Sequence, residues 1–465
     1  MGTVVESPAE PVQTQFGPLP SRAELLAAGK RLRESCPRGA HAGWNPPPDR
    51  PDPLDLLRQS SEGRIPELIP IRYGRMMASP FAWYRGTALI MASDLSRTPS
   101  SGLRVQACGD AHLANFGAYG TPERRVVFDL NDFDETLPAP WEWDIKRLGA
   151  SFVLACRSNG FDKDTARDSV LACVKSYREH MADLSEMRAL EVWYADHAMD
   201  SIFSSVKDKE ARKRGERRVS KARKMGMRDY PQWEVGADGS PTIKEDPPLI
   251  YHWKEHGREE LMAVVRQAFE HYRSTVPEHL TVLLDRFQLM DIAVKVVGVG
   301  SVGTRCFILL LMGRENDVLF LQVKEARPSV LQAYAGPSVH PNNGQRIVTG
   351  CQIMQAASDL FLGWARSEGG RDYYFRQLKD MKIKPLIEDF TPDFTLQYAA
   401  MCGRALANAH ARSGSPVEIT GYLGRNDRFD EAIADFSVPY ADQSERDHAA
   451  LVKAVRSGQL EAAQE

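Results

Sequence analysis

The sequence has no long hydrophobic run, which argues against a membrane-spanning segment. Its richest apolar stretch, residues 307–312, is six residues long, whereas a membrane span needs ~18 or more. The first residues also lack a basic segment followed by an apolar one, so we expect no secretory signal peptide. We therefore expect a soluble protein that has no membrane partner.

Cysteine pairs and an excess of one charge are missing too. Seven cysteines are scattered along the chain without a Cys-x-x-Cys pair, so we expect reduced, mostly buried thiols in the cytoplasm rather than a disulfide framework. Lys and Arg number 59 and Asp and Glu number 62, which gives a net charge of −3. This balance excludes a surface built throughout for polyanions, but it leaves room for a local basic patch.

What is present is the composition of a folded chain, with 43% hydrophobic and 26% charged residues among 465. Apolar spacing and turn residues predict helices and strands after a proline-rich, loose N-terminal arm, and peripheral helices at the C-terminal end. Helices are expected at 23–34, 71–94, 143–159, 163–198, 253–272, 348–367 and 394–412, and strands at 104–108, 125–130, 292–297, 305–312 and 319–323.

The densest chemical signal lies in two strings, GDAHLANFG from residue 109 and VFDLNDFDE from residue 127. Asp110 and Asn115 stand in a glycine-flanked loop after one expected strand, and Asp129 ends the next strand. Mg²⁺-dependent phosphoryl transfer needs a carboxylate that deprotonates the acceptor, together with an amide oxygen and a second carboxylate that hold the metal. Asp110 would then act as the base, and Asn115 and Asp129 would bind Mg²⁺.

Simpler interpretations of these two strings exist. Each acid taken alone could be a turn former or a helix cap, although so many acids and amides at two strand ends make that interpretation the weaker one. A calcium loop at 129–134 is disfavoured because the glycine at its sixth position and the glutamate at its twelfth are missing. His112 could be a base or a metal ligand, but it has no partner at ligand spacing and is expected to pack within the loop.

A glycine-rich segment, VGVGSVGT at 297–304, is the second signal. The apolar residues after it have no helical spacing, so we expect a hairpin that covers phosphates rather than the helix start of a dinucleotide-binding unit. The next strand ends in Lys324, which is costly to bury unless it meets an anion such as a phosphate. An edge-strand lysine that faces water is the simpler alternative.

Basic and aromatic residues elsewhere allow two interpretations each. Arg72, Arg75 and Arg85 suit a clamp for phosphate or carboxylate groups, or equally ion pairs with the acidic segment 129–144. The run at 207–228 holds eleven Lys and Arg against three acids. It could bind an acidic partner or a nucleic acid, but a solvated helical insertion is favoured because aromatic residues are scarce in it. Trp141 and Trp143 are expected to pack rather than to stack on bases.

Further strings extend the pattern, namely WEWDIKRL from residue 141, LQVKEA from residue 321 and RALANAHARSG from residue 404. Together with the glycine segment and the two acidic strings, they resemble an uncharacterised bacterial family, domain-of-unknown-function family 2252. The resemblance spans about residues 72–413. That family is grouped with protein-kinase-like and aminoglycoside-phosphotransferase-like proteins.

The resemblance implies a role for each candidate residue. Asp110 matches the catalytic aspartate and Asn115 a metal ligand. Asp129 matches the metal-binding aspartate, with Asp132 as its rival or as a second ligand. Asp144 matches a residue that supports the backbone of the catalytic loop. The nucleotide-binding residues would be Gly298, Gly300, Ser301, Gly303 and Lys324.

Two departures from the family pattern concern individual residues. Cys108 stands where phosphotransferases usually carry a histidine, so that histidine's role is unfilled or transferred. The lysine's usual glutamate partner has no clear match, and Glu325, Asp359 and Glu368 are the candidates.

The order of the motifs departs further, because the glycine segment and Lys324 follow the catalytic loop instead of preceding it. The resemblance therefore implies an α+β, two-lobed protein-kinase-like fold that is circularly permuted and carries a helical insertion. Its expected parts are an N-terminal arm (1–60), a catalytic and metal-loop part (61–200), a basic helical insertion (201–280), a β-rich nucleotide lobe (281–385) and completing helices (386–465).

The expected function is an ATP- and Mg²⁺-dependent phosphotransferase in the cytoplasm. Its acceptor would be a small-molecule hydroxyl or a protein side chain. Two alternatives stay open, namely adenylyl transfer by the same site and a nucleotide-binding regulatory module without turnover.

Overall fold

The computed structural model describes most of the chain. The described residues are 19–199, 213, 216–217, 219–220, 232–236, 239–247, 249–252, 258–296, 298–378 and 381–463. Most of the basic run at 207–228 lies outside them, so an acidic or nucleic-acid partner for that run stays a prediction. None of the helices formed by the described residues combines the length and the hydrophobicity that a membrane crossing requires.

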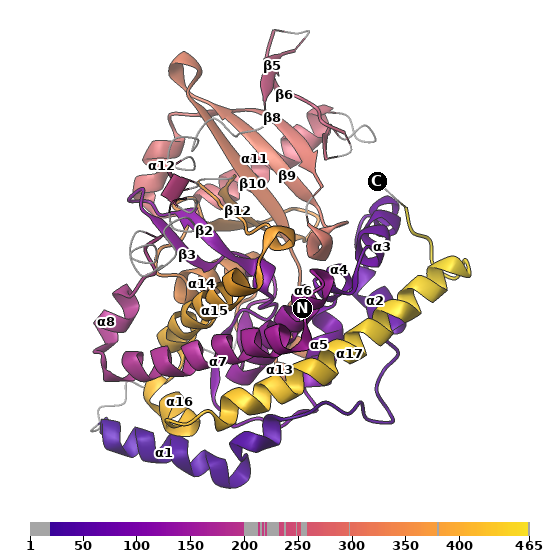
Figure 1. Ribbon diagram of the computed structural model, residues 1–465. Coiled ribbons are helices and arrows are strands. Elements are labelled where there is room, and N and C mark those ends of the chain that lie inside the picture. The colour runs from indigo at the N-terminus through magenta and orange to yellow at the C-terminus, as the bar shows by residue number, and fades with distance from the viewer. Residues whose placement is uncertain are drawn as a thin grey trace, which may run out of the picture.

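A six-stranded sheet forms the upper part of the molecule in Figure 1. Its strands pair antiparallel in the order β11-β12-β10-β9-β8-β7. They are β7 (Ile250–Tyr251), β8 (Gln288–Lys295), β9 (Cys306–Met312), β10 (Val318–Ala326), β11 (Gly363–Arg366) and β12 (Asp372–Gln377). Every residue of β9 is buried because both sheet faces are covered, which explains its unbroken apolar sequence. The strands expected at 292–297, 305–312 and 319–323 are thus confirmed.

Helices and a short hairpin cover the two faces of this sheet. On one face, α11 (Arg258–Arg273) and α12 (Glu278–Leu284) bury Phe269, Tyr272 and Leu284 against the strands. On the other face, Ile243 packs on Ile308 and Phe320. Ile243 belongs to the hairpin formed by β5 (Trp233–Val235) and β6 (Pro241–Ile243).

The rest of the chain is mainly helical and holds the largest apolar core. Its long helices are α6 (Trp141–Ser158), α7 (Lys163–Glu186), α15 (Pro392–Ser413) and α17 (Arg428–Arg456). A Cβ on Gly403 of α15 would lie 2.0 Å from the carbonyl oxygen of Cys173 on α7, so only glycine allows this close approach of the two helices. Trp141 is fully buried and stacks on Tyr177 with ring centroids 5.7 Å apart, which confirms that it packs.

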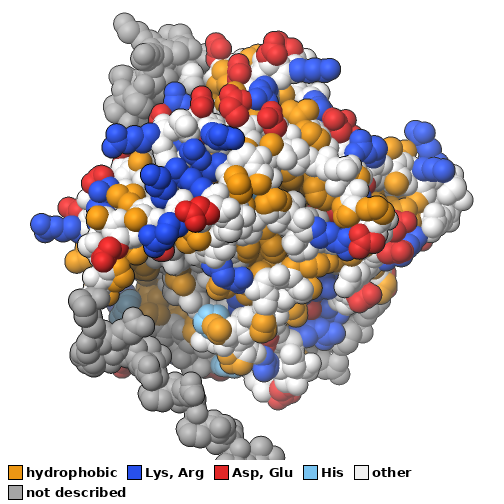
Figure 2. All heavy atoms as spheres, turned by 90° about the horizontal axis from the view of Figure 1, so that it is seen from below, with side chains coloured by type: hydrophobic (Ala, Val, Ile, Leu, Met, Phe, Trp, Pro, Cys, Tyr) orange, Lys and Arg blue, Asp and Glu red, His pale blue; other side chains and the backbone are white. Residues whose placement is uncertain are grey.

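Shorter elements complete this part of the chain. The helices are α1 (Arg22–Ser35), α2 (Pro53–Ser61), α3 (Ile69–Met77), α4 (Pro80–Tyr84), α5 (Ala88–Leu95), α8 (Ala189–Tyr194), α13 (Gln332–Ala335), α14 (Asn343–Met354) and α16 (Pro416–Leu423), and the strands are β1 (Arg104–Ala107), β2 (Phe116–Gly120), β3 (Val126–Leu130) and β4 (Leu137–Pro140). All seven cysteines are free and buried, as expected. Acidic and basic side chains are interspersed over the face seen from below in Figure 2.

Three of the expected helices were wrong. The helix expected at 163–198 ends at Glu186, and a separate short helix, α8, follows it. The helix expected at 71–94 is three helices, because Ser79 caps α4 before Pro80 and the chain turns at Gly86. The helix expected at 348–367 ends at Met354, and Gly363–Arg366 form strand β11 instead. This strand pairs with β12 across a turn in which Gly370 has φ +76, a conformation that favours glycine.

Neither end of the described chain is loose or peripheral. Helix α17 buries Phe429, Ile433 and Phe436 in the main core. In the N-terminal segment, Arg50 bonds both carboxylate oxygens of Asp94 (2.8 and 2.9 Å) and of Asp447 (3.0 and 2.7 Å). The expected loose arm is therefore wrong for residues 19–60, which are fixed to the helical core.

Replacing Arg50 with methionine should lower the free energy of unfolding by about 3 kcal/mol or more. The change leaves the Asp94 and Asp447 side chains, only 2% and 6% exposed, buried without their cation. Urea unfolding measures the loss. In the control, Arg97→Met, the partner Asp49 is 78% exposed, and the loss should stay below about 1 kcal/mol. Equal losses in the two variants would contradict the argument.

His252 ties the segment before α11 to the sheet. Its Nε2 lies 2.8 Å from Asp291 Oδ2 on β8 and its Nδ1 lies 2.9 Å from Glu245 Oε1. The hydrogen bond with Asp291 is the main cause that raises the His252 pKa above the ordinary 6.5, against the effect of partial burial. The contacts of protonated His252 therefore stabilise the fold fully below about pH 6.5. This stabilisation is lost as the pH rises through the raised pKa.

The loss of stability in His252→Asn should therefore be larger at about pH 5.5 than at about pH 9. Chemical unfolding of both proteins at the two pH values measures it. His279→Asn, which changes an exposed histidine, serves as the control. A loss for His252→Asn that grows with pH would show that the neutral imidazole makes the contacts.

Candidate functional site

Two loops that the sequence singled out lie side by side. The Asp110 loop (residues 108–115) follows β1, and the Asp132 loop (residues 131–136) follows β3. Strand β1 pairs with β4 and β2 with β3, both antiparallel. In addition, Asn131 N donates to Asn115 O at 3.0 Å. These pairings hold the two loops together.

Asp144, in the first turn of α6, holds the backbone of the Asp110 loop. Its Oδ2 accepts from Cys108 N at 2.6 Å and its Oδ1 accepts from Gly109 N at 3.0 Å. These are the contacts that the resemblance implies for a supporting aspartate. Nε2 of His410 on α15 lies 3.2 Å from Asp144 Oδ2. A histidine from a distant segment thus contacts the aspartate that holds the Asp110 loop.

Gly109 allows the two loops to approach each other. Its φ is +78, and a Cβ there would lie 2.5 Å from the carbonyl oxygen of Glu135. Both facts exclude a side chain at this position. The glycine before Asp110 is therefore a structural requirement of the site.

Asp110 is oriented by a buried arginine. Nε of Arg147 donates to Asp110 Oδ1 at 2.6 Å, and its guanidinium lies 4.5 Å from the centre of the Tyr84 ring. Among the described residues, the ionic neighbour of Asp110 Oδ2 is the more distant His112 Nε2 at 3.9 Å. Burial raises the pKa of Asp110 to about 7 although Arg147 opposes this. A carboxylate with such a pKa is suited to take up a proton near neutral pH.

Asn115 and Asp132 each offer an oxygen atom. Asn115 Nδ2 donates to Asp110 O at 2.8 Å, which leaves the amide oxygen as its available group. Asp132 Oδ1 is buried without a hydrogen-bond partner. Within the described part of the chain, no group of three or more His, Cys, Asp and Glu side chains could hold a metal ion. A metal here would thus have few protein ligands, as Mg²⁺ often does.

Asp129 lies in a different environment from Asp132. It is buried in β3, and its Oδ1 accepts from Leu130 N at 2.8 Å. Burial raises its pKa to about 7, while the charge of Arg412 on α15 lowers it. The cation next to Asp132 is instead Lys324, whose Nζ lies 3.9 Å from Asp132 Oδ1. The structure thus separates the two candidate aspartates, and only Asp132 has the strand lysine among its ion pairs.

Asp134 joins the acidic loop to the sheet. Lys324 Nζ on β10 lies 2.7 Å from Asp134 Oδ2, and Ser301 Oγ in the glycine segment donates to the same oxygen at 3.2 Å. Tyr374 on β12 donates to Asp134 Oδ1 at 2.6 Å. Although burial opposes it, Lys324 lowers the pKa of Asp134 to about 2. Residues from three separate stretches of the chain therefore meet at Asp134.

Asp134 is the acidic partner of Lys324 that the sequence analysis did not identify. Of the three candidates, Glu325 pairs with Arg305 and Glu368 accepts from Gln267. Asp359 accepts from the backbone N–H groups of residues 361 and 377. Among the described residues, Lys324 forms ion pairs with Asp134 and Asp132. The only signal for this was the third aspartate in the string VFDLNDFDE.

The glycine segment is the turn of a hairpin, as expected. Strands β8 and β9 pair antiparallel on either side of it. Gly298 and Gly300 are exposed, and Gly303 has φ +84. Arg64 fixes the turn by donating to Gly300 O at 2.9 Å and to Val302 O at 2.5 Å. The turn therefore has a defined position beside Asp134.

The three arginines before the Asp110 loop lie in different places. Arg72 is buried and donates to the hydroxyls of Ser60 and Ser61 and to Gly86 O, so it contacts neither a substrate site nor the acidic segment. Arg75 lies half-buried in the last turn of α3. Arg85 alone lies at the site. Burial lowers its pKa, and the charges of Asp110 and Asp132 oppose this.

Two lysines near Asp132 were missed by the sequence analysis. Lys382 and Lys384 flank Ile383, which exchanges backbone hydrogen bonds of 2.7 and 3.1 Å with Ala118 on β2. The charge of Asp132 acts on both lysines. The alternation Lys-Ile-Lys was the available signal, but nothing local in the sequence showed that this segment pairs with β2.

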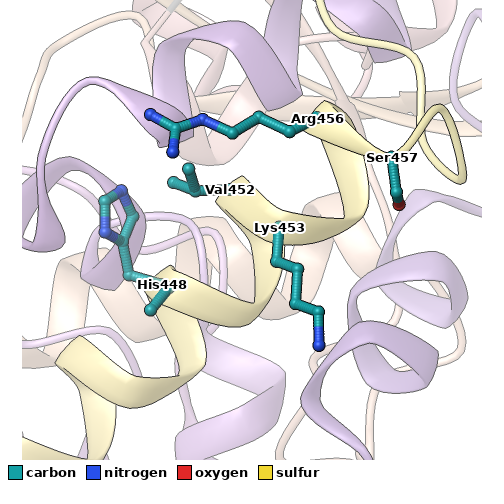
Figure 3. A pocket seen from close by; sticks show the side chains of 6 residues that line it. His448, Val452, Lys453, Arg456 and Ser457 are labelled. Carbon is teal, nitrogen blue, oxygen red and sulfur yellow. The ribbon is translucent and has the colours of Figure 1, made fainter.

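A hollow of about 570 Å³ lies elsewhere, along the C-terminal part of α17 (Figure 3). The lining consists of residues of this one helix and the residue that follows it, namely His448, Ala449, Val452, Lys453, Arg456 and Ser457. The lining contains no acid, and none of the candidate site residues belongs to it. The chemistry of the two loops is therefore not located in this hollow.

Comparison with known proteins gives one result. A family model described as "Uncharacterized protein conserved in bacteria (DUF2252)" matches residues 64–454. The matched range includes both loops, the glycine turn and Lys324. No curated protein and no solved structure matches the chain.

Proposed function

The chain belongs to the DUF2252 family of uncharacterized bacterial proteins, and we propose that it is an ATP- and Mg²⁺-dependent phosphotransferase with a two-lobed, circularly permuted kinase-like fold. The sheet would be the nucleotide lobe, and the helical part would carry the two loops. In a kinase the nucleotide-binding sheet comes before the catalytic loops in the chain. Here the sheet comes after them, and in this proposal it occupies the same position relative to them in space.

One observation carries this proposal, namely the meeting of the sheet and the acidic loop at Asp134. Lys324 and Asp134 are 190 residues apart in the chain and 2.7 Å apart in space. Ser301, at the turn of the β8–β9 hairpin, reaches the same carboxylate. A glycine turn, a strand lysine and an acidic loop are the parts that enclose the phosphates of ATP in kinases.

The residues present fit a magnesium–nucleotide complex. Asp132 Oδ1 is a buried acceptor that no described residue satisfies, and an unsatisfied group of this kind calls for a ligand. Asp132 and the amide oxygen of Asn115 would hold Mg²⁺, which binds hard oxygen ligands and keeps several waters. Lys324 would bind phosphate oxygens while Asp134 keeps its ammonium group in place.

Each group would have one role in the proposed phosphoryl transfer. Mg·ATP would supply an activated phosphoryl group. Asp110 would orient the acceptor hydroxyl and take its proton at Oδ2, the oxygen that Arg147 does not hold. Asp144 would keep the Asp110 loop in position through its two backbone contacts.

Labelled ATP tests the proposal. The pure protein is incubated with Mg²⁺ and a broad panel of acceptors, using ATP labelled either on the γ-phosphate or on the adenine. Phosphotransfer predicts γ-label on an acceptor and no adenine label. Adenine label would indicate adenylyl transfer, and nucleotide binding without either product would indicate a regulatory module. Both of these outcomes would overturn the proposal.

Replacing Lys324 with methionine should weaken the binding of Mg·ATP by about 10-fold or more. A hydrogen bond to a charged group contributes about 1.5–3 kcal/mol, and 1.4 kcal/mol corresponds to a tenfold change in affinity. Calorimetric titration with a non-hydrolysable ATP analogue measures the change. Lys163→Met, at an exposed lysine, is the control, and Lys324→Arg tests whether the charge alone suffices. Unchanged affinity in Lys324→Met would contradict the assignment.

A further inference from the structure

The charge of Asp132 acts on Arg85, Lys382 and Lys384, and none of the three has an acidic partner among the described residues. Buried Arg50 has two carboxylate partners, whereas buried Arg72 is satisfied by hydroxyl and carbonyl oxygens. Removing a cation from water without an anion is costly. Arg85 is half-buried with its Nε unsatisfied, Lys382 is half-buried and Lys384 is exposed. It is therefore the gathering of the three cations, and above all Arg85, that needs an explanation.

Arg85 lies where an acceptor would meet the base. It directly follows Tyr84, whose ring contacts Arg147, the residue that holds Asp110. Its guanidinium reaches the glycine turn, where NH2 lies 4.0 Å from the position of a Cβ on Gly298. Its Nε is buried without a hydrogen-bond partner.

The charges of both Asp110 and Asp132 act on Arg85. An arginine placed between the base, the metal-binding aspartate and the glycine turn faces the centre of the site. Because its Nε is unsatisfied and the group has five N–H donors in a planar fork, it is suited to an oxyanion.

The two lysines approach Asp132 from the segment that connects the sheet to α15. Ile383 pairs with Ala118 of β2 through two backbone hydrogen bonds. Residues on either side of a paired residue point to the same face of an extended segment, so Lys382 and Lys384 share a face. Both act electrostatically on Asp132, and Lys384 also on Arg85.

In addition to burial, the charge of Lys384 lowers the pKa of Lys382, and the charge of Arg85 lowers that of Lys384. An anion between the three groups would relieve this repulsion. The phosphates of a nucleotide already have Lys324, the glycine turn and the proposed metal. Arg85 is part of the helical lobe together with Asp110, on the side of the acceptor. The three remaining cations are therefore available to bind the second substrate, the acceptor.

We propose that Arg85, Lys382 and Lys384 bind an oxyanion group of the acceptor, so that the substrate is a small hydroxyl compound carrying its own phosphate or carboxylate. This inference rests on the proposed function. It narrows the acceptor from any hydroxyl to an anionic one, and it disfavours a neutral sugar or a plain alcohol.

Inorganic phosphate serves as the probe. The full-length protein is saturated with Mg²⁺ and a non-hydrolysable ATP analogue and is then titrated with phosphate in a calorimeter. We expect phosphate to bind in addition to the analogue. The double variant R85Q/K384Q should weaken phosphate binding by about 10-fold or more and leave the affinity for the analogue within about 2-fold. The control is R97Q/K163Q, which removes two cations distant from Asp132.

Each result decides the inference. Competition between phosphate and the analogue would show that these cations belong to the nucleotide, and phosphate binding that the double variant leaves unchanged would place the anion elsewhere. Either result overturns the inference, as does a lack of phosphate binding. If the analogue fails to bind but phosphate binds through Arg85 and Lys384, the proposed function fails and the anion site stands. Titration with malonate in the same way separates a carboxylate preference from a phosphate preference.

Discussion

Asp110→Asn should lower the turnover of Mg·ATP by about 10²- to 10⁴-fold, the contribution typical of a general base. Asparagine keeps the shape of the side chain but cannot take up a proton. Nucleotide affinity should change little, because Asp110 pairs with Arg147, whereas Lys324 pairs with Asp134 and Asp132. The effect should therefore fall on kcat and leave nucleotide binding within a few-fold.

The measurement pairs steady-state turnover with analogue binding in the same preparations. Asp168→Asn, at an exposed position on α7, is the matched control. Because Asp110 is the partner of buried Arg147, thermal unfolding has to show that the variant is folded. Turnover close to that of the unaltered protein would contradict the role of Asp110. A loss of affinity as large as the loss of turnover would place Asp110 at the nucleotide instead.

Asp132→Asn should lower turnover by about 10²- to 10³-fold and raise the Mg²⁺ concentration needed for half-maximal activity. A metal ion contributes several kcal/mol of charge stabilisation, and each 1.36 kcal/mol corresponds to tenfold in rate. The reason to choose this aspartate is structural. It is the one with a buried, unsatisfied oxygen and with Lys324 at 3.9 Å.

Asp129→Asn is the matched comparison. Its carboxylate interacts with Arg412 and the backbone of β3, and burial raises its pKa. The neutral asparagine should therefore not lower the free energy of unfolding at neutral pH, and it should leave the Mg²⁺ dependence of activity as it was. Titration of activity with Mg²⁺ in both variants separates the two effects. If Asp129→Asn altered the Mg²⁺ dependence and Asp132→Asn did not, the metal would belong to Asp129.

Much of the site could be predicted because its signals are local in the sequence. Asp110 and Asn115 share one short loop after a strand, and the amide of Asn115 bonds back to Asp110 O. The β8–β9 hairpin followed from glycines with apolar strands on both sides. Each of these features depends on a stretch of a few residues, so propensity and spacing were sufficient.

What could not be predicted depends on contacts between distant segments. Our choice of Asp132 over Asp129 as the metal ligand rests on Arg412 of α15, whose charge acts on Asp129, and on Lys324 of β10, which pairs with Asp132. Neither is near these aspartates in the sequence. The same holds for Asp134, which meets Lys324 only because the sheet packs on the loop.

Contacts between distant segments also explain why the fold of the N-terminal segment could not be predicted. Its prolines indicated a loose arm, but Arg50 pairs with two acids that are 44 and 397 residues away in the chain. Tertiary ion pairs of this kind leave no periodic pattern in the sequence.

A crystal structure of the protein with Mn²⁺ and a non-hydrolysable ATP analogue tests the central claim most directly, because anomalous scattering locates the metal. The account predicts a metal bound by the Asn115 amide oxygen and the Asp132 carboxylate, with the phosphates of the analogue beside Lys324 and the glycine turn. A metal at Asp129, or an analogue bound away from Lys324, would contradict it.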